Sequence, residues 1–303
     1  MDQVPVIVST NYKGGVGKTT TSRVLAQTLA ELDSFTKGKP ILVIDLDPQG
    51  NTSRRWNLMV YTEAGTSVPR PHPELAEEDS NSSSVCDLWL DLLGLADIGL
   101  LPVPYVTSNP MIHVVPANED LMFEAISLPR DQRHKLGESM RIWLRAKNMA
   151  ETYSCVIIDT QPSKTPLIDA ALFAATHVYI PFIPEPQAVE GVYAIISYVY
   201  TQSQQRSGDA PLTILGLLPN MVQKTKLHSL HLRTLEKHKT FSKYLMPVKL
   251  SRRIGYSETD DWRNTPEKVT DLEGSDIEFE AMKFAKYIAG RLTDNKKEAR
   301  NGV

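Results

Sequence analysis

The chain is poor in several features that would assign it to other classes of protein. Its 303 residues include two cysteines, Cys86 and Cys155, too few for a disulfide framework and without the spacing of metal ligands. No apolar run approaches the roughly 18 residues that a membrane span needs. The N-terminus leads into an apolar run without the charged segment and cleavage site of an export signal. These absences predict a protein of the reducing cytoplasm that does not bind membranes.

Long internal repeats and low-complexity tracts are also absent. Instead, continuous apolar runs alternate with segments whose apolar residues have helical spacing. Continuous apolar runs, such as residues 41–46 and 155–158, are typical of strands buried on both faces of a parallel sheet. Between residue 4 and about residue 219, a segment with helical spacing lies between one apolar run and the next. The pattern predicts an α/β fold, with residues 1–303 forming a single domain around a doubly wound, mostly parallel sheet that has helices on both faces. Residues 276–293 are expected to add a C-terminal helix.

Residues 62–84 differ from the segments around them. Prolines cluster near residues 69–73, acidic residues follow at 77–79, and serines crowd residues 80–84. This composition is typical of an exposed, mobile insertion, to which we assign no chemistry. Helices are expected over residues 85–95 and 136–151.

A glycine-rich stretch follows the first apolar run and precedes a segment with helical spacing. Its residues are Lys13, Gly14, Gly15, Val16, Gly17, Lys18, Thr19 and Thr20. Strand, glycine-rich turn and helix form the context in which such a stretch binds phosphate, because glycines let successive N–H groups converge on the anion at the positive end of the helix. Lys18 is expected to reach the β- and γ-phosphates and the Thr19 hydroxyl to hold Mg²⁺.

Acidic residues stand at the ends of two later apolar runs. Asp45 and Asp47 end the run that begins at residue 41, and Asp159 ends the run over residues 155–158. Ligands of doubly wound sheets bind at the carboxyl edge of the strands, so these aspartates are expected beside the phosphate loop. An acid in the position of Asp159 holds Mg²⁺ through water in other phosphate-loop proteins.

Residues 11–20 resemble the deviant Walker A motif of the ParA/MinD superfamily, most closely that of the ParA-type partition ATPases. The resemblance implies that the ligand is ATP and that Lys13 crosses the interface of a sandwich homodimer to touch the partner's ATP. Tyr12 stands where the family usually has Gln or Arg, a departure interpreted as neutral. Residues 45–51 resemble the family's D-x-D-P-Q-G-N segment, which implies that Asp47 positions the attacking water and the Mg²⁺ shell. Lys13, Lys18 and Asp47 are therefore the expected catalytic residues.

The resemblance continues through the rest of the chain. Residues 159–163 are similar to the family's switch loop, although Gln161 departs from its usual D-x-P-P pattern. Residues 184–191 are similar to a segment that helps to form the nucleotide pocket and the dimer face. Pro219 and Asn220 follow the last buried run, where the family's asparagine hydrogen-bonds adenine. The alternative for Asn220 is turn formation after the strand.

Positive charge is concentrated in residues 224–253. This segment holds nine Lys or Arg and one acid, Glu236, so that its charge is near +8 in a protein of net charge −3. Such asymmetry indicates a polyanionic partner, and the lack of an aromatic ladder favours contact with the phosphate backbone over base readout. The alternative is a solvated face. ParA relatives bind DNA without sequence preference through this part of the ATP-bound dimer, and the expected contacts are Lys224, Lys226, Arg252 and Arg253.

The resemblance thus predicts a weakly hydrolysing, nucleoid-associated DNA-partition ATPase that a ParB-like centromere-binding protein stimulates. It further implies the ParA type without an N-terminal helix-turn-helix domain. The polar last residues lack the apolar membrane helix of MinD-type proteins. Three alternatives remain: a nucleoid-riding ATPase that positions a protein cargo, an electron carrier related to nitrogenase reductase, and an amide ligase on the same scaffold. The electron carrier would need two cysteines per subunit around an iron–sulfur cluster.

Overall fold

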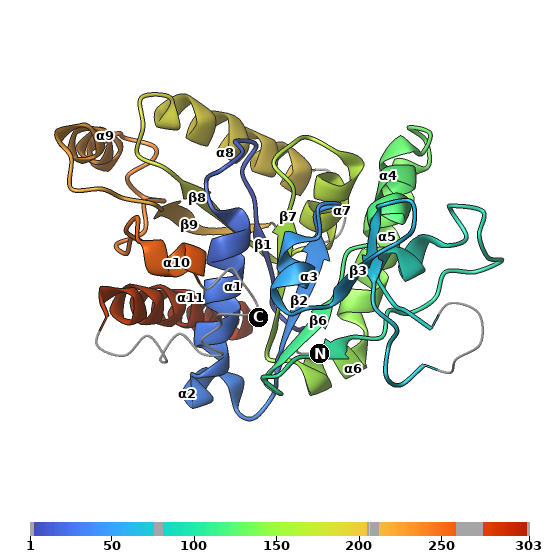
Figure 1. Ribbon diagram of the computed structural model, residues 1–303. Helices are drawn as coiled ribbons and strands as arrows, with labels where there is room; N and C mark the ends of the chain where they lie inside the picture. The colour runs from blue at the N-terminus through green and yellow to red at the C-terminus, as the bar shows by residue number, and fades with distance from the viewer. Residues whose placement is uncertain (1–2, 76–80, 205, 207–211, 259–274, 302–303) are drawn as a thin grey trace.

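The computed structural model describes residues 3–75, 81–204, 206, 212–258 and 275–301 (Figure 1). Its centre is a seven-stranded sheet in the order β5-β6-β2-β7-β1-β8-β9. All neighbouring strands run parallel except β5, which is antiparallel to β6. The strands are β1 (Val6–Ser9), β2 (Ile41–Leu46), β5 (Tyr105–Val106), β6 (Ile112–Val115), β7 (Cys155–Thr160), β8 (His177–Phe182) and β9 (Thr213–Pro219). The predicted fold class, a mostly parallel doubly wound sheet, is confirmed.

Helices cover both faces of this sheet. Figure 1 shows α1 and α11 side by side on one face and α5 and α7 packed together on the other. The helices are α1 (Lys18–Ala30), α2 (Asp33–Thr36), α3 (Asn51–Arg55), α4 (Glu119–Ser127), α5 (Arg133–Arg145), α6 (Lys147–Thr152), α7 (Pro166–Ala174), α8 (Ala188–Gln204), α9 (Lys226–Lys237), α10 (Ile254–Glu258) and α11 (Asp276–Asn301), with a 3-10 helix, η1 (Val85–Trp89). Within the described ranges, no helix combines the length and apolar character that crossing a bilayer requires.

The continuous apolar runs form strands because both sides of each strand are covered. In β1, Val6 and Val8 belong to the core on the α7 side, whereas Ile7 belongs to the core on the α1 side. Every residue of β2 and β7 is buried. Because successive side chains point to opposite faces, burial on both faces requires an apolar residue at nearly every position.

Several helix boundaries differ from those expected. The helix expected over residues 136–151 is two helices, α5 and α6, separated at Ala146, whose ψ of 143° is extended. The helix expected over residues 85–95 is limited to η1, which a capping box between Ser84 and Asp87 begins. The C-terminal helix extends to Asn301 rather than residue 293. Helix α9, inside the basic segment, was not predicted.

The insertion at residues 62–84 is partly packed. Strand β4 (Ser67–Pro69) pairs with β3 (Met59–Tyr61), and the Ser67 N–H donates to the Glu119 carboxylate at 2.9 Å. The ring of His72, which is 3% exposed, lies 4.3 Å from the ring of Tyr105. The expectation of an exposed segment is therefore wrong for these residues, because a short hairpin anchors them to α4 and β5. Residues 76–80 lie outside the described residues, and mobility remains a prediction.

Candidate functional site

The order of the central strands brings the predicted site residues to one edge of the sheet. Strand β7 lies between β1 and β2, and its Asp159 pairs in register with Ser9 on one side and Asp45 on the other. The glycine-rich loop begins just after β1, and Asp47 follows β2. The carboxyl ends of parallel strands meet at the same edge, so the loop and the aspartates converge there.

The loop between β1 and α1 has the conformation that a phosphate cradle requires. Gly15 and Gly17 have φ values of 73° and 83°, in the left-handed region that favours glycine. Gly17 caps the N-terminus of α1, whose first residue is Lys18. A Cβ atom at Gly17 would lie 2.3 Å from the Asn220 side-chain nitrogen. The backbone here accepts no side chain, and its N–H groups and helix terminus fit an anion.

Asn220 supports this loop directly. Its Nδ2 donates a hydrogen bond of 2.7 Å to the Val16 carbonyl, and the residue is 4% exposed. The structure thus gives Asn220 a contact with the phosphate loop that neither sequence interpretation included. Hydrogen bonding to adenine stays a prediction.

Lys18 lies inside the site rather than at the surface. It is 6% exposed, and its Nζ donates to the Lys13 carbonyl at 3.3 Å. Burial lowers the pKa of the Lys18 ammonium, while Asp159 and Asp47 oppose that shift. Lys18 therefore shares one electrostatic site with both carboxylates.

Asp159 is fully buried and accepts hydrogen bonds from three hydroxyl groups on two helices, α1 and α3. Thr52 donates at 2.8 Å, Ser22 donates at 3.3 Å, and the Thr19 side chain also bonds to this carboxylate. Burial raises the pKa of Asp159 to about 6, although the bonds from Thr19 and Thr52 lower it. The hydroxyl groups hold the carboxylate in one orientation at the end of β7.

Asp45, in β2, and Asp47, just after it, have different surroundings. The Asp45 carboxylate is fully buried and accepts bonds from the Ser53 N–H at 2.8 Å, the Ser53 hydroxyl at 2.6 Å and the Asp47 N–H at 3.2 Å. Burial raises its pKa to about 8. Asp47 accepts a bond from the Gln49 N–H at 3.0 Å, and burial raises its pKa. Asp45 therefore anchors α3, which leaves Asp47 as the carboxylate beside Lys18.

The donor set fits a magnesium ion bound together with a triphosphate. The Thr19 hydroxyl and the Asp47 and Asp159 carboxylates are hard oxygen ligands, the kind that Mg²⁺ prefers when substrate phosphates complete its shell. When bound, the ion would neutralise phosphate charge. These residues would hold it directly or through water.

A cavity of about 520 Å³ opens beside the first turn of α1. Its lining includes Thr20, Asn220, Met221, Arg252 and Tyr256. This volume lies within the range of small-molecule sites. Pro219, expected to bind nucleotide, lines a different groove, and its carbonyl accepts the Leu250 N–H at 2.9 Å.

Lys13 has an ion-pair partner that the sequence did not indicate. Its Nζ lies 2.8 Å from the Glu185 carboxylate, in the segment between β8 and α8. The two side chains are 45% and 42% exposed. The first lysine of the loop therefore lies at the surface, next to the buried site that contains Lys18.

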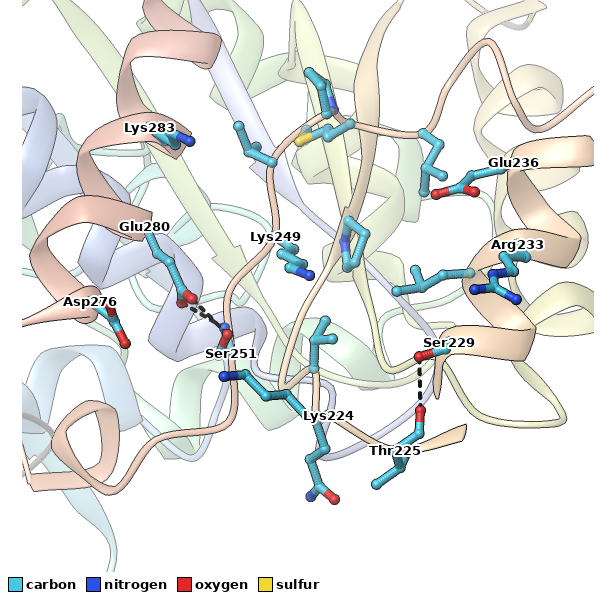
Figure 2. A pocket seen from close by; sticks show the side chains of 18 of the residues that line it. Lys224, Thr225, Ser229, Arg233, Glu236, Lys249, Ser251, Asp276, Glu280 and Lys283 are labelled. Carbon is cyan, nitrogen blue, oxygen red and sulfur yellow. Dashed lines mark hydrogen bonds between the residues drawn. The ribbon is translucent and has the colours of Figure 1, made fainter. Parts of the chain in front are cut away.

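The basic segment forms one wall of a groove of about 1180 Å³ between α9 and α11 (Figure 2). Its basic lining residues are Lys224, Lys226, Arg233, Lys249, Arg253 and Lys283. Figure 2 shows the Glu280 carboxylate turned toward Ser251, which donates to it from its backbone N–H and its hydroxyl at 2.7 Å and 2.6 Å.

The four residues expected to contact DNA are not equivalent. Lys224 and Lys226 are exposed at the N-terminus of α9, and Arg252 is exposed beside the smaller cavity. Arg253, by contrast, donates to the Asp276 carboxylate at 2.5 Å and lies 3.9 Å from that of Glu280. Two acids thus offset its charge. The structure makes Arg253 a weaker candidate than the sequence suggested.

The two cysteines cannot support the electron-carrier alternative. Cys86 and Cys155 are fully buried, in η1 and β7. Burial raises the pKa of the Cys86 thiol well above its ordinary value. A cluster bridging two subunits needs thiolates at the surface, which neither residue provides.

Sequence reasoning missed the residues that support the site through hydrogen bonds and ion pairs. Thr52 and Ser53 directly follow the D-x-D-P-Q-G-N segment, and this position was a signal that they could face the aspartates. Ser22 lies one turn beyond Lys18 on α1. Glu185 had no such signal, because the contact with Lys13 depends on the packing of β8 beside β1.

Known proteins share both the sequence and the fold. A family model described as an AAA domain matches residues 4–210. The chromosome-partitioning ATPase Soj of Thermus thermophilus is 34% identical over 218 residues, which cover 71% of this chain and 68% of Soj.

Two solved structures show the shared fold at 17% identity. The complex of Cyanothece McdA with ATP has a TM-score of 0.69 and covers 96% of this chain and 98% of its own. MinD of Pyrococcus horikoshii with Mg-ADP has a TM-score of 0.62, with coverage of 94% and 95%. From its sequence matches, its fold and its phosphate loop, the chain belongs to the ParA-type partition ATPases.

Proposed function

We propose that this protein is an ATP-switched DNA-partition ATPase. ATP closes a homodimer, the dimer binds DNA without sequence preference, and weak hydrolysis stimulated by a ParB-like partner releases it. One observation is the main support: Lys18 of the phosphate loop, Asp47 and Asp159 are buried together at one sheet edge, and Lys13 lies at the surface beside them. The name of the Thermus relative supports the partition role.

Each group of the site has a part in this cycle. The loop N–H groups and Lys18 bind the phosphates, and the cavity beside Thr20 and Asn220 takes the nucleoside. Asp47 orients the attacking water, which its position beside Lys18 supports. Lys13 leaves Glu185 and reaches the phosphates bound by the second subunit. Hydrolysis is slow until the partner protein completes the site.

DNA contact is expected along the basic groove. Lys224 and Lys226 are exposed there, and Arg252 is exposed beside the smaller cavity; within the described part of the chain, no ion pair offsets the charge of these three residues. Lysine and arginine neutralise backbone phosphates without reading bases, so binding depends on salt rather than on sequence.

DNA retention tests this proposal. The protein is expected to retain DNA with ATP, and to lose it with ADP or without nucleotide. Log affinity should fall with log salt by roughly 0.9 per phosphate neutralised. Equal retention in all three nucleotide states would contradict the switch.

Variants separate dimerisation from DNA contact. Lys13→Ala should bind ATP as a monomer but form no ATP-dependent dimer and retain no DNA. The double variant Lys224→Ala with Lys226→Ala should form the dimer, measured by light scattering, and lose DNA. Arg253→Ala should lose less than Arg252→Ala because Asp276 already offsets the Arg253 charge. Parent-strength DNA binding by monomeric Lys13→Ala would break the link between the sandwich and the DNA surface.

A further inference from the structure

Three side chains from separate elements meet beside the phosphate loop. The Lys164 ammonium lies 4.9 Å from the ring centroid of Tyr12 and 5.1 Å from that of Tyr198. The two rings are 5.2 Å apart and inclined at 61°, in an edge-to-face arrangement. Tyr12 precedes Lys13, Lys164 lies between β7 and α7, and Tyr198 belongs to α8.

These distances lie within the range of cation–π contacts, and the rings add an aromatic pair. One lysine therefore links two aromatic faces that are 186 residues apart in the sequence. The Asp169 carboxylate on α7 also interacts with Lys164, and Gln202 of α8 donates to that carboxylate at 3.2 Å. The cluster connects the phosphate loop, the loop after Asp159, α7 and α8.

Other contacts show that the same two loops are adjacent. A Cβ atom at Gly14 would lie 3.9 Å from Pro162, which precedes Lys164 by two residues. Gln161 donates to the Thr165 hydroxyl at 2.5 Å and so closes the loop that carries Lys164. Movement of this loop would therefore be transmitted to the start of the phosphate loop.

We propose that Tyr12, Lys164 and Tyr198 form a cation–π clamp that positions the phosphate loop and fixes where Lys13 emerges toward a second subunit. Lys164 is a positioning residue in this arrangement and touches no reacting group. Tyr12 and Lys13 are consecutive, and both contact the α8 side of the fold, Tyr12 through Tyr198 and Lys13 through Glu185. In this proposal Tyr12 has a positioning role, whereas the sequence alone suggested that its departure from the family pattern is neutral.

The clamp makes a specific demand on side-chain chemistry. It needs a cation at position 164 and an aromatic face at position 12, but no tyrosine hydroxyl, since none of the described residues hydrogen-bonds to the Tyr12 oxygen. Arginine can replace lysine because its guanidinium also stacks on aromatic faces. Methionine keeps the length of the side chain and removes the charge.

The test measures ATP turnover and rests on the proposed ATPase function. Lys164→Met should lower kcat roughly fivefold, the size expected when two exposed cation–π contacts are lost, while KM for ATP stays within about twofold. Lys164→Arg and Tyr12→Phe should resemble the parent. Lys147→Met is the matched control. Lys147 is also an exposed lysine, but it lies on α6, before the start of β7, whereas Lys164 follows the end of β7.

A double-mutant cycle shows whether the residues act as one unit. Tyr12→Leu should lower kcat and the free energy of unfolding as much as Lys164→Met does. The double variant should show no larger loss than either single variant. Unfolding is measured in urea without nucleotide. Additive losses, or a kcat for Lys164→Met equal to that of the parent, would overturn the clamp. The two proposals fail differently. If the parent protein does not hydrolyse ATP, the proposed ATPase function is refuted, but the double-mutant cycle measured by urea unfolding still tests the clamp.

Discussion

The Lys13 ammonium and the Glu185 carboxylate form an ion pair 2.8 Å long within one subunit. The pair holds the Lys13 side chain on the α8 side of its own subunit. Contact with Lys13 lowers the pKa of Glu185, so the carboxylate is charged at neutral pH. In a sandwich dimer, Glu185 and the partner's nucleotide phosphates would compete for the same ammonium group.

Glu185→Gln should favour the ATP-dependent dimer, because it removes this competition. Exposed ion pairs contribute about 0–1 kcal/mol, so the dimer dissociation constant should fall by at most about fivefold. Light scattering over a protein concentration series with ATP measures the change. Glu151→Gln, which breaks the exposed pair with Lys147, is the control. A weaker dimer would mean that Glu185 has a positive role in the interface.

Asp47→Ala should bind ATP and dimerise but hydrolyse at least about tenfold more slowly, because the variant keeps the phosphate cradle and loses the group that orients water. The dimer should therefore remain on DNA. Phosphate release under single-turnover conditions, together with DNA retention, measures both effects. Hydrolysis at the parent rate would move the catalytic role to another acid, of which Asp159 is the next candidate.

Asn220→Ala tests the support of the phosphate loop. It removes the donor to the buried Val16 carbonyl, which should cost about 1–3 kcal/mol and weaken nucleotide binding. If Asn220 acts through the loop, affinity for ATP and GTP should fall by the same factor. Loss of ATP affinity with no loss for GTP would instead support the adenine contact. Equilibrium dialysis with both nucleotides distinguishes the two roles.

Asp169→Asn tests a pH dependence of stability in the cluster around Lys164. Burial raises the pKa of Asp169 to about 6, although Lys164 and Arg133 lower it. The folded chain therefore binds this proton more tightly than the unfolded chain, and the stability it contributes is lost as pH rises through about 6. The loss should stay below about 1 kcal/mol, because solvent screens a carboxylate at the surface.

Urea unfolding of the parent and Asp169→Asn proteins between about pH 4 and pH 7 measures this contribution. The parent should lose stability relative to the variant as the pH rises. Identical slopes would show that Asp169 titrates at its ordinary pKa.

The sequence by itself determined the fold class and the position of the phosphate loop. Both depend on local patterns: continuous apolar runs require strands covered on both faces, and glycines at positions 15 and 17 allow left-handed backbone. The sequence also placed Asp47 and Asp159 at the carboxyl ends of their strands. It was less accurate at helix boundaries, because no glycine or proline marks the break at Ala146.

Tertiary structure alone decided which of these residues touch. The contacts of Asn220 with Val16, Glu185 with Lys13, and Lys164 with Tyr12 join residues more than 150 positions apart. Their distances depend on strand order and register, which place β1 between β7 and β8. Asp276 likewise offsets the charge of Arg253 only because α11 packs beside the basic segment. A local pattern fixes backbone conformation, whereas contacts between distant segments follow from how the whole chain buries its apolar surface.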